Sequence, residues 1–222
     1  MNNLVLINSV ICTINEPLSY TNTRSIYTHE ERFLHTQKTI ESIKKNIPNS
    51  KILIVECSEL NEEQNNYLIQ NSDYFLNLYN NEQIRKNVQS NSKSLGEGSM
   101  THCAIEYILS NNIIFDNFIK ISGRYWLSDN FNYNNFDNTN IVIKYIDVDH
   151  ISISTVLYKL PRDYIIQFKL FLECNFHEMI NCIGYEVLFA IFIKSLNTNN
   201  ILILDKFGVE GHISVSTDFY SG

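Results

Sequence analysis

An alternation of apolar and amphipathic segments in residues 1–80 limits how this chain can fold more than any other feature. Three apolar runs rich in β-branched residues are separated by two stretches whose apolar residues recur at helical spacing. We predict strands at 3–13, 51–58 and 73–79, and helices at 33–50 and 61–70. Such alternation is typical of a parallel sheet with right-handed crossovers.

The rest of the chain adds a mixed set of elements. The sequence predicts a glycine-bearing turn that leads into a helix within 92–112, and then a strand at 117–122. It also predicts two strands around a polar turn within 140–161. In the second strand, the side chains of residues 151–158 alternate between the two faces of the strand. Helices follow to about Ser195 with a break at 181–186, and a strand, a glycine turn and a short strand lie within 200–216. The expected fold class is α/β, a single domain with a mixed, mainly parallel sheet flanked by helices.

Composition narrows the class of protein. A chain of 222 residues that is 44% hydrophobic can bury a large core in one domain. Its net charge of -7 argues against a general nucleic-acid binder but permits a local basic pocket for a phosphate. Five scattered cysteines without a CxxC pair are interpreted as buried free thiols in a reducing compartment.

Targeting signals are not evident in the sequence. The first apolar run lacks a basic segment before it, and no apolar run approaches the roughly 18 residues of a membrane span. We therefore expect a cytoplasmic protein without a transmembrane segment, and peripheral membrane contact stays open.

Polar side chains cluster at the expected carboxyl ends of the strands, where ligands bind in open α/β sheets. Ser9 lies near the end of the first strand, and Glu56 ends the second. The loop after the first strand carries two arginines, and a Lys-Gly-Glu cluster opens the helix before the fourth strand. The candidate contacts in these places, with those that follow the fourth strand, are Ser9, Arg24, Arg32, Glu56, Lys93, Gly96, Glu97, Ser122, Gly123, Arg124 and Tyr125.

Arg124 is the most informative of these residues. After Gly123 the backbone can turn sharply, and a guanidinium fork suits a diphosphate or a carboxylate. The alternative is an arginine that pairs with a nearby carboxylate and fixes a loop. Tyr125 either stacks on a ring or packs in the core. Gly96 and Glu97 either place free N–H groups at an anion or belong to a flexible loop with an ordinary first-turn acid.

Acidic residues and a histidine supply further candidates. Asp147 and Asp149 precede a histidine and can bind a divalent cation, although aspartates are also common in polar turns. His212 is either a ligand contact or a surface residue. Glu186 lies in an apolar stretch, either as a general base in a cleft or at an exposed helix position.

In several blocks, and over nearly its whole length, the chain resembles GT-A-like glycosyltransferases of bacterial surface-polysaccharide clusters and large DNA viruses. The most specific blocks are "KISGRY" and the segment "RSIYTHEERFLHTQKTIESI"; the others are "KSLGEG", "TVLYKLP", "IGYE" and "FGVEGHIS". The resemblance implies a nucleotide-binding half at 1–126, an acceptor-binding half at 127–222, a nucleotide-sugar donor, a glycan or glycolipid acceptor and a role in polysaccharide biosynthesis.

The chain departs from this family at one position. A DxD motif that holds a divalent metal commonly follows the fourth strand of GT-A enzymes, and here that place reads Ser-Gly-Arg-Tyr at 122–125. Either Arg124 and Lys120 neutralise the diphosphate without metal, or Asp147 and Asp149 form a displaced DxD that binds Mn²⁺ or Mg²⁺. The first alternative is favoured by position.

The resulting hypothesis is a glycosyltransferase. Arg124 and Lys93 would hold the leaving diphosphate, and Glu186 or Asp149 would deprotonate the acceptor hydroxyl. Three alternatives are a non-catalytic nucleotide- or glycan-binding protein on the same fold, a nucleotidyltransferase, and a structural or interaction protein, which would leave the polar cluster at the strand ends unexplained. The second usually has a glycine-rich basic loop after the first strand, which "INSVICTINEP" lacks.

Overall fold

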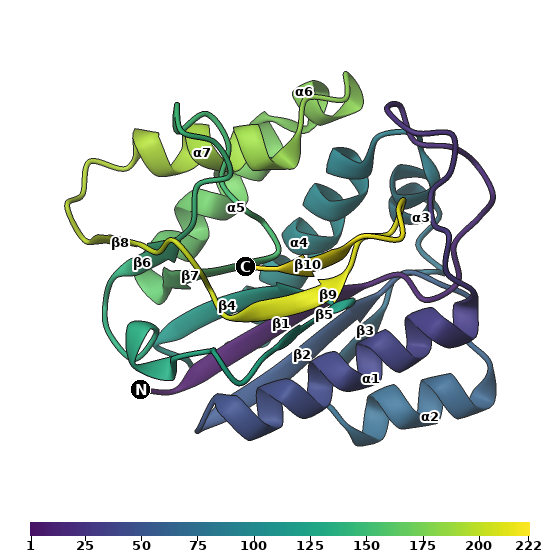
Figure 1. Ribbon diagram of the computed structural model, residues 1–222, viewed down its shortest axis with the longest axis horizontal. Helices are drawn as coiled ribbons and strands as arrows, with labels where there is room; N and C mark the ends of the chain where they lie inside the picture. Colours follow the sequence, from purple (N-terminus) through teal and green to yellow (C-terminus); the bar gives the residue numbers. More distant parts are fainter.

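The computed structural model describes residues 1–222 and contains two sheets (Figure 1). The larger sheet has seven strands in the order β3-β2-β1-β4-β7-β6-β8. Its strands are β1 (Asn3–Ser9), β2 (Ser50–Glu56), β3 (Tyr74–Asn77), β4 (Asn117–Ser122), β6 (Ile141–Ile143), β7 (Leu157–Pro161) and β8 (Ile201–Ile203). The smaller sheet has the order β10-β9-β5, with β5 (Tyr125–Leu127), β9 (Val209–His212) and β10 (Phe219–Ser221).

Strand β1 lies in the centre of the large sheet. It pairs in parallel with β2 and β4, and β2 pairs in parallel with β3. Strand β7 is antiparallel to both β4 and β6. The predicted fold class, a mixed and mainly parallel α/β sheet, is therefore confirmed.

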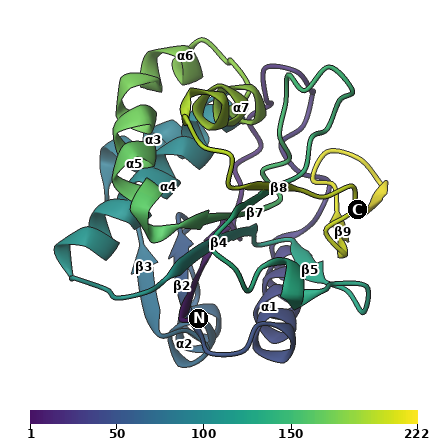
Figure 2. The same cartoon turned by 90° about the vertical axis from the view of Figure 1, so that its left-hand side faces the viewer.

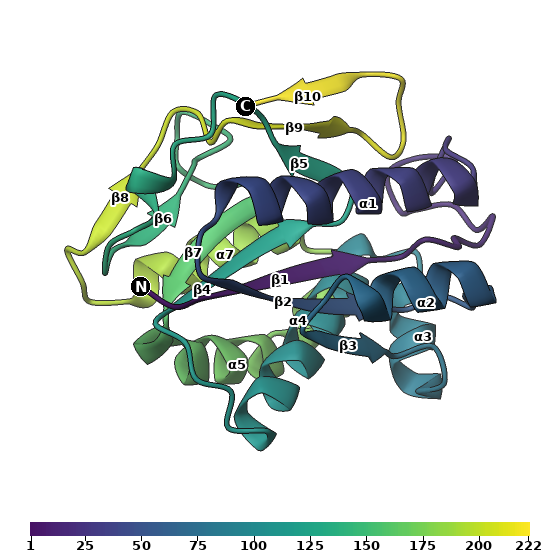
Figure 3. The same ribbon diagram turned by 90° about the horizontal axis from the view of Figure 1, so that it is seen from below.

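Helices cover both faces of this sheet (Figures 2 and 3). Helices α1 (His29–Asn46) and α2 (Glu62–Gln70) lie on one face, where the small sheet packs beside α1. The other face carries α3 (Glu82–Gln89), α4 (Lys93–Ser110), α5 (Ile165–Cys174), α6 (Phe176–Ile180) and α7 (Tyr185–Ser195).

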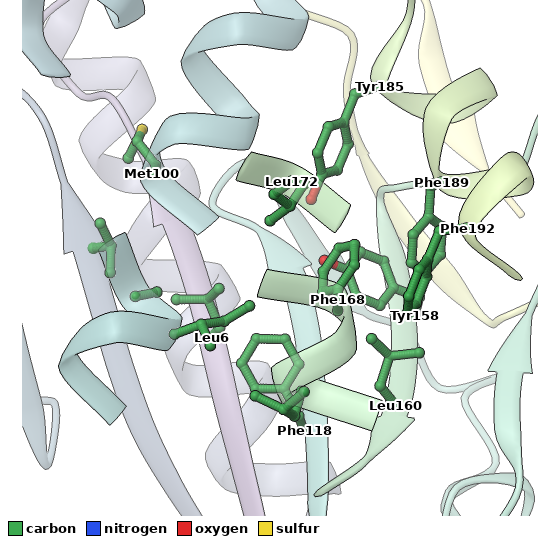
Figure 4. Close-up of a cluster of buried hydrophobic side chains, with 14 of the residues drawn as sticks. Leu6, Met100, Phe118, Tyr158, Leu160, Phe168, Leu172, Tyr185, Phe189 and Phe192 are labelled. Carbon is green, nitrogen blue, oxygen red and sulfur yellow. The ribbon is translucent and has the colours of Figure 1, made fainter. Parts of the chain in front are cut away.

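Successive residues of each central strand enter different halves of the core, because strand side chains alternate between the two faces of a sheet. Leu6 and Phe118 pack against α4, α5 and α7 in the cluster of Figure 4. Ile7 and Ile119 pack on the other side, with Phe33 of α1. Both faces are buried, and the strands therefore read as continuous apolar runs in the sequence.

Two helices begin at polar caps rather than at the expected apolar residues. Helix α1 starts four residues early because Thr28 and Glu31 form a capping box. Helix α4 starts at Lys93, capped by the Ser92 hydroxyl. The predicted glycine turn is therefore wrong, since Gly96 lies inside the helix, where a Cβ would approach the Val88 Cα of α3 to 3.1 Å.

Other differences concern short elements and the cysteines. Residues 144–156 form a loop, and the alternating pattern expected to extend a strand from 151 becomes strand only at Leu157. Elements α3, β5 and β10 were not predicted. Only Cys57 is buried and Cys174 is exposed, so the expectation of uniformly buried thiols is wrong; all five cysteines are free. None of the helices has the length and apolar character needed to cross a membrane.

Candidate functional site

A cavity of about 330 Å³, here called the main cavity, lies at the carboxyl ends of β1 and β4. Residues from several distant segments line it, as expected for an open α/β sheet. Eleven of the candidates from the sequence meet there: Ser9, Arg24, Arg32, Lys93, Gly96, Glu97, Ser122, Gly123, Arg124, Tyr125 and Glu186.

The turn after β4 is held against β1 and α1. The Gly123 N–H donates to the Asn8 carbonyl oxygen at 2.9 Å, and the Thr36 hydroxyl donates to the Gly123 carbonyl oxygen at 2.9 Å. A Cβ on Gly123 would lie 3.0 Å from the Cβ of Ser9. The close approach of the two strand ends brings the following residue, Arg124, to the cavity wall.

Arg124 and Arg32 are bound to oxygen atoms that carry no full charge. Arg124 Nη1 donates to the His212 carbonyl oxygen at 2.8 Å. Arg32 is only 6% exposed and donates from Nε to the Val10 carbonyl oxygen at 2.9 Å and from Nη1 to the Ser214 hydroxyl at 3.1 Å. Burial, and then the charge of Arg124, lower the pKa of Arg32 to about 9. The nearby Arg124 guanidinium therefore disfavours the protonated form of Arg32.

Arg24 has the same kind of environment. Its Nη1 donates to the Val88 carbonyl oxygen at 2.9 Å, and its Nη2 donates to the Gln89 carbonyl oxygen at 3.1 Å. None of these three arginines forms an ion pair. In a chain of net charge -7 the main cavity thus gathers three guanidinium groups without carboxylate partners.

A second set of charges is paired internally. Lys120 is fully buried, and its ammonium donates to the Glu97 carboxylate, the Ser122 hydroxyl and the Thr155 carbonyl oxygen. Burial is the largest influence and would raise the pKa of Glu97, but the Lys120 ammonium, with Lys93 and Arg124, outweighs it and the pKa is lowered. All three Lys120 donors are used, so this lysine supports Glu97 and does not contact a diphosphate as hypothesised.

Lys93 and Glu186 face each other across the cavity wall. Lys93 Nζ lies 3.9 Å from Glu186 Oε1, and their side chains are 48% and 31% exposed. The Thr155 hydroxyl lies 3.3 Å from the same carboxylate oxygen. Glu186 is therefore half-buried, positioned by two neighbours and open to the cavity.

Glu56 and His212 do not line the main cavity. Glu56 is fully buried and accepts from the N–H groups of Ile11 at 3.1 Å and Cys57 at 2.9 Å. Burial raises its pKa. It holds the loop after β1, which corrects its assignment as a ligand contact. The His212 ring stacks on His35 at 4.4 Å, so His212 acts on the cavity through the carbonyl that holds Arg124.

The aspartate pair lies in the turn 147–150 of the loop 144–156 and does not line the main cavity, although Thr155 and Val156 of the same loop do. The Asp147 carboxylate accepts from the Ile151 N–H at 2.8 Å and the Ser152 N–H at 2.7 Å, and so shapes the turn. Asp149 is exposed and also absent from the cavity wall. The structure does not bring either aspartate to the other candidate residues.

A divalent metal on a diphosphate would need carboxylates in the main cavity. The carboxylates there are Glu97, bound to Lys120, and Glu186, beside Lys93. The residues present do not fit such a metal. A separate cluster of His102, Cys103 and Glu106 lies on α4, where Lys169 Nζ already approaches Glu106 to 3.5 Å.

Several lining residues were missed by sequence reasoning. Asn8, Tyr20, Thr155 and Ser214 line the main cavity, and each comes from a loop or strand end. The place of Asn8 near the carboxyl end of β1 would have indicated it. The others reach the cavity through long-range packing, for which the local sequence has no signal.

Neither a family model nor a curated protein matches this sequence. Solved structures share its fold. Core-mannan synthase A from Aspergillus fumigatus, in its Mn/GDP form, matches with a TM-score of 0.56 at 9% identity over 95% of this chain and 74% of that chain. The CTP:phosphocholine cytidylyltransferase LicC from Streptococcus pneumoniae gives 0.53 at 12% identity over 95% and 93%.

A putative nucleotide-diphospho-sugar transferase from Desulfovibrio desulfuricans G20 gives a TM-score of 0.50 at 9% identity over 92% of this chain and 80% of that chain. The chain therefore has the GT-A-like, Rossmann-like fold, as the resemblance implied. At these identities the likeness concerns the fold alone.

Proposed function

We propose that the chain is a glycosyltransferase that binds a nucleotide sugar in the main cavity and moves the sugar to a hydroxyl acceptor. One observation carries this proposal: Arg24, Arg32 and Arg124 line the cavity without a carboxylate partner. Arg124 makes one hydrogen bond, to the His212 carbonyl oxygen, so its other N–H groups can bind phosphate oxygens. Arg24 and Arg32 donate mostly to oxygens of the protein and contribute positive charge, which a diphosphate would balance. The fold shared with nucleotide-diphospho-sugar transferases supports the same ligand class.

The reaction follows from where charge develops. The acceptor oxygen forms a bond to the anomeric carbon while the bond from that carbon to the diphosphate oxygen breaks, and the electron pair leaves with the diphosphate. Arg32 and Arg124, fixed in advance by their hydrogen bonds, stabilise the negative charge that grows there.

Glu186 is the proposed general base. Its carboxylate faces the main cavity and takes the proton of the acceptor hydroxyl, while Lys93 at 3.9 Å and the Thr155 hydroxyl orient it. Of the two bases considered from the sequence, Asp149 is exposed and does not line the main cavity. We retain Glu186 for this reason.

Diphosphate binding through arginines needs no metal, and the lining carboxylates are already beside lysines. We therefore favour the metal-independent alternative and route no step through Mn²⁺ or Mg²⁺. A glycan or glycolipid acceptor and a role in polysaccharide biosynthesis stay predictions of the resemblance.

The loop after β1 weighs against a nucleotidyltransferase. The N–H groups of Ile11 and Cys12 donate to Glu56 and to the Ser58 hydroxyl, so neither is offered to a phosphate. A non-catalytic binder on this fold differs from the enzyme in one respect, since it would not hydrolyse a bound nucleotide sugar.

A thermal-shift screen tests the proposal, because a ligand that binds only the folded state raises the unfolding midpoint. The ligands are UDP, GDP, CMP and dTDP and their sugars, each with and without manganese. We expect one nucleotide class to raise the midpoint without manganese, followed by slow hydrolysis of its sugar. No shift with any nucleotide would overturn the proposal.

A further inference from the structure

A second cavity, of about 310 Å³, adjoins the main cavity. Its wall is formed by the start of α4, by residues of the segment 182–186, which leads into the first turn of α7, and by residues 19–20. Four residues line both cavities: Tyr20, Lys93, Glu97 and Glu186. The two cavities therefore meet at Glu186, the proposed general base, and at Lys93, which orients it.

Ser94 gives the second cavity an unused hydrogen-bonding group. Ser94 is one of the residues that line the cavity and is only 7% exposed, and its hydroxyl has no hydrogen-bond partner within the protein. The first N–H groups of a helix also have no partner within that helix, and α4 begins at this point with Lys93. A buried hydroxyl without a partner is costly, so a ligand that bonds to it is favoured.

The chemistry of the wall selects a neutral, hydroxyl-rich ligand. Glu97 and Glu186 repel a second phosphate, and the Lys93 ammonium lies beside Glu186. The carboxylates accept hydrogen bonds and the Lys93 ammonium donates them. Together with the hydroxyls of Ser19 and Ser94, these groups match the hydroxyl groups of a sugar ring. The volume falls at the lower end of the range of about 300–1,000 Å³ for small-molecule pockets.

We propose that the second cavity is a subsite for a sugar ring, which it holds next to Glu186 where the two cavities join. This inference rests on the proposed function, and it assigns the nucleotide diphosphate part of the donor to the main cavity. The ring has two possible sources, the sugar of the donor and the sugar of an acceptor, and both present the same hydroxyl chemistry.

Cys182 makes the subsite measurable without any substitution. Its thiol is free and half-buried, and it lines the second cavity but not the main one. Cys174 is exposed on α5 outside both cavities and serves as the internal control. Alkylation of each thiol by N-ethylmaleimide is followed by peptide mass mapping on the full chain.

Three ligand conditions separate the sources: the nucleoside diphosphate that stabilises the protein most, the same diphosphate with methyl pyranosides, and the corresponding nucleotide sugar. A ligand at ten times its dissociation constant should slow Cys182 alkylation about tenfold by mass action, and Cys174 should be unaffected. Protection by the nucleotide sugar but not by the diphosphate identifies the donor ring. Protection by a pyranoside identifies an acceptor ring.

A Ser94→Leu variant supplies an independent check, because it replaces the hydroxyl of a lining residue with a larger apolar side chain. We expect protection of Cys182 to be lost while the midpoint shift with the nucleoside diphosphate is kept. If the nucleotide sugar raises the midpoint but no sugar protects Cys182, the subsite is wrong and the proposed function stands. If no nucleotide raises the midpoint and no sugar protects, both are wrong.

Discussion

Lys93 Nζ lies 3.9 Å from Glu186 Oε1, at the point where the two cavities of the protein meet. The separation is longer than a hydrogen bond of about 2.7–2.9 Å between charged groups, so the carboxylate is oriented but not fully occupied. A carboxylate in this state can still accept a proton from a substrate.

Replacing Glu186 with Gln should therefore abolish the base but keep the shape of the wall. We expect turnover to fall by about 10²- to 10⁴-fold, with little change in affinity for the nucleoside diphosphate. Steady-state kinetics and calorimetric titration measure the two effects separately. Asp149→Asn is the control, and unchanged turnover in Glu186→Gln would refute the assignment.

Lys120→Met should unfold the site instead of weakening ligand contact. The variant leaves Glu97, whose side chain is only 12% exposed, without its partner, and breaking such a pair costs about 3–5 kcal/mol of unfolding free energy. Urea denaturation measures this loss. The double variant with Glu97→Gln should recover much of it, and an equally unstable double variant would mean that the pair is not coupled.

His35 makes stability depend on pH. Burial, with His212 and Arg124 nearby, lowers the pKa of His35 to about 4, whereas in the unfolded chain it is about 6.5. Because the folded pKa is depressed, the contribution to stability is complete above about pH 6.5 and is lost as the pH falls towards about 4. The loss amounts to about 2–3 kcal/mol.

Denaturation curves of wild type and His35→Phe at pH 7.5 and pH 4.5 test this effect, since Phe keeps an aromatic ring beside His212 but does not titrate. The variant should lose less stability than wild type on acidification. Equal losses in the two proteins would contradict it.

Metal removal should leave nucleotide binding intact. The lining carboxylates already have lysine neighbours, so EDTA or manganese should change the affinity for a nucleoside diphosphate by less than about threefold. Titration calorimetry in both buffers gives the comparison. Binding that requires manganese would contradict the metal-independent site.

The sequence predicts the parallel half of the fold well because its signals are local. Strands buried on both faces appear as continuous apolar runs, and β1, β2 and β4 were found in this way. The small sheet was missed because β5 pairs with β9 across about eighty residues of chain. That pairing needs contacts which no short window records.

The candidate site was likewise predictable only where the signal is local. Position at a strand end placed Ser9 and Arg124 correctly at the cavity wall. Composition alone could not show that Lys120 is bound by Glu97, since the two residues lie on different elements. Nor could it show that both oxygens of Asp147 accept from its own loop, because that depends on the backbone path.

The central claim is that unpaired arginines in the main cavity bind a diphosphate. The direct measurement is a calorimetric titration, without metal, of the nucleoside diphosphate that stabilises the protein most, into wild type, Arg124→Ala and Arg162→Ala. Arg162 is an exposed arginine that follows β7 at the opposite end of the sheet, which makes it a matched control.

Hydrogen bonds to charged groups contribute about 1.5–3 kcal/mol, so Arg124→Ala should weaken binding by about 10- to 100-fold. Arg162→Ala should bind like wild type. Equal affinities in all three proteins would contradict the account.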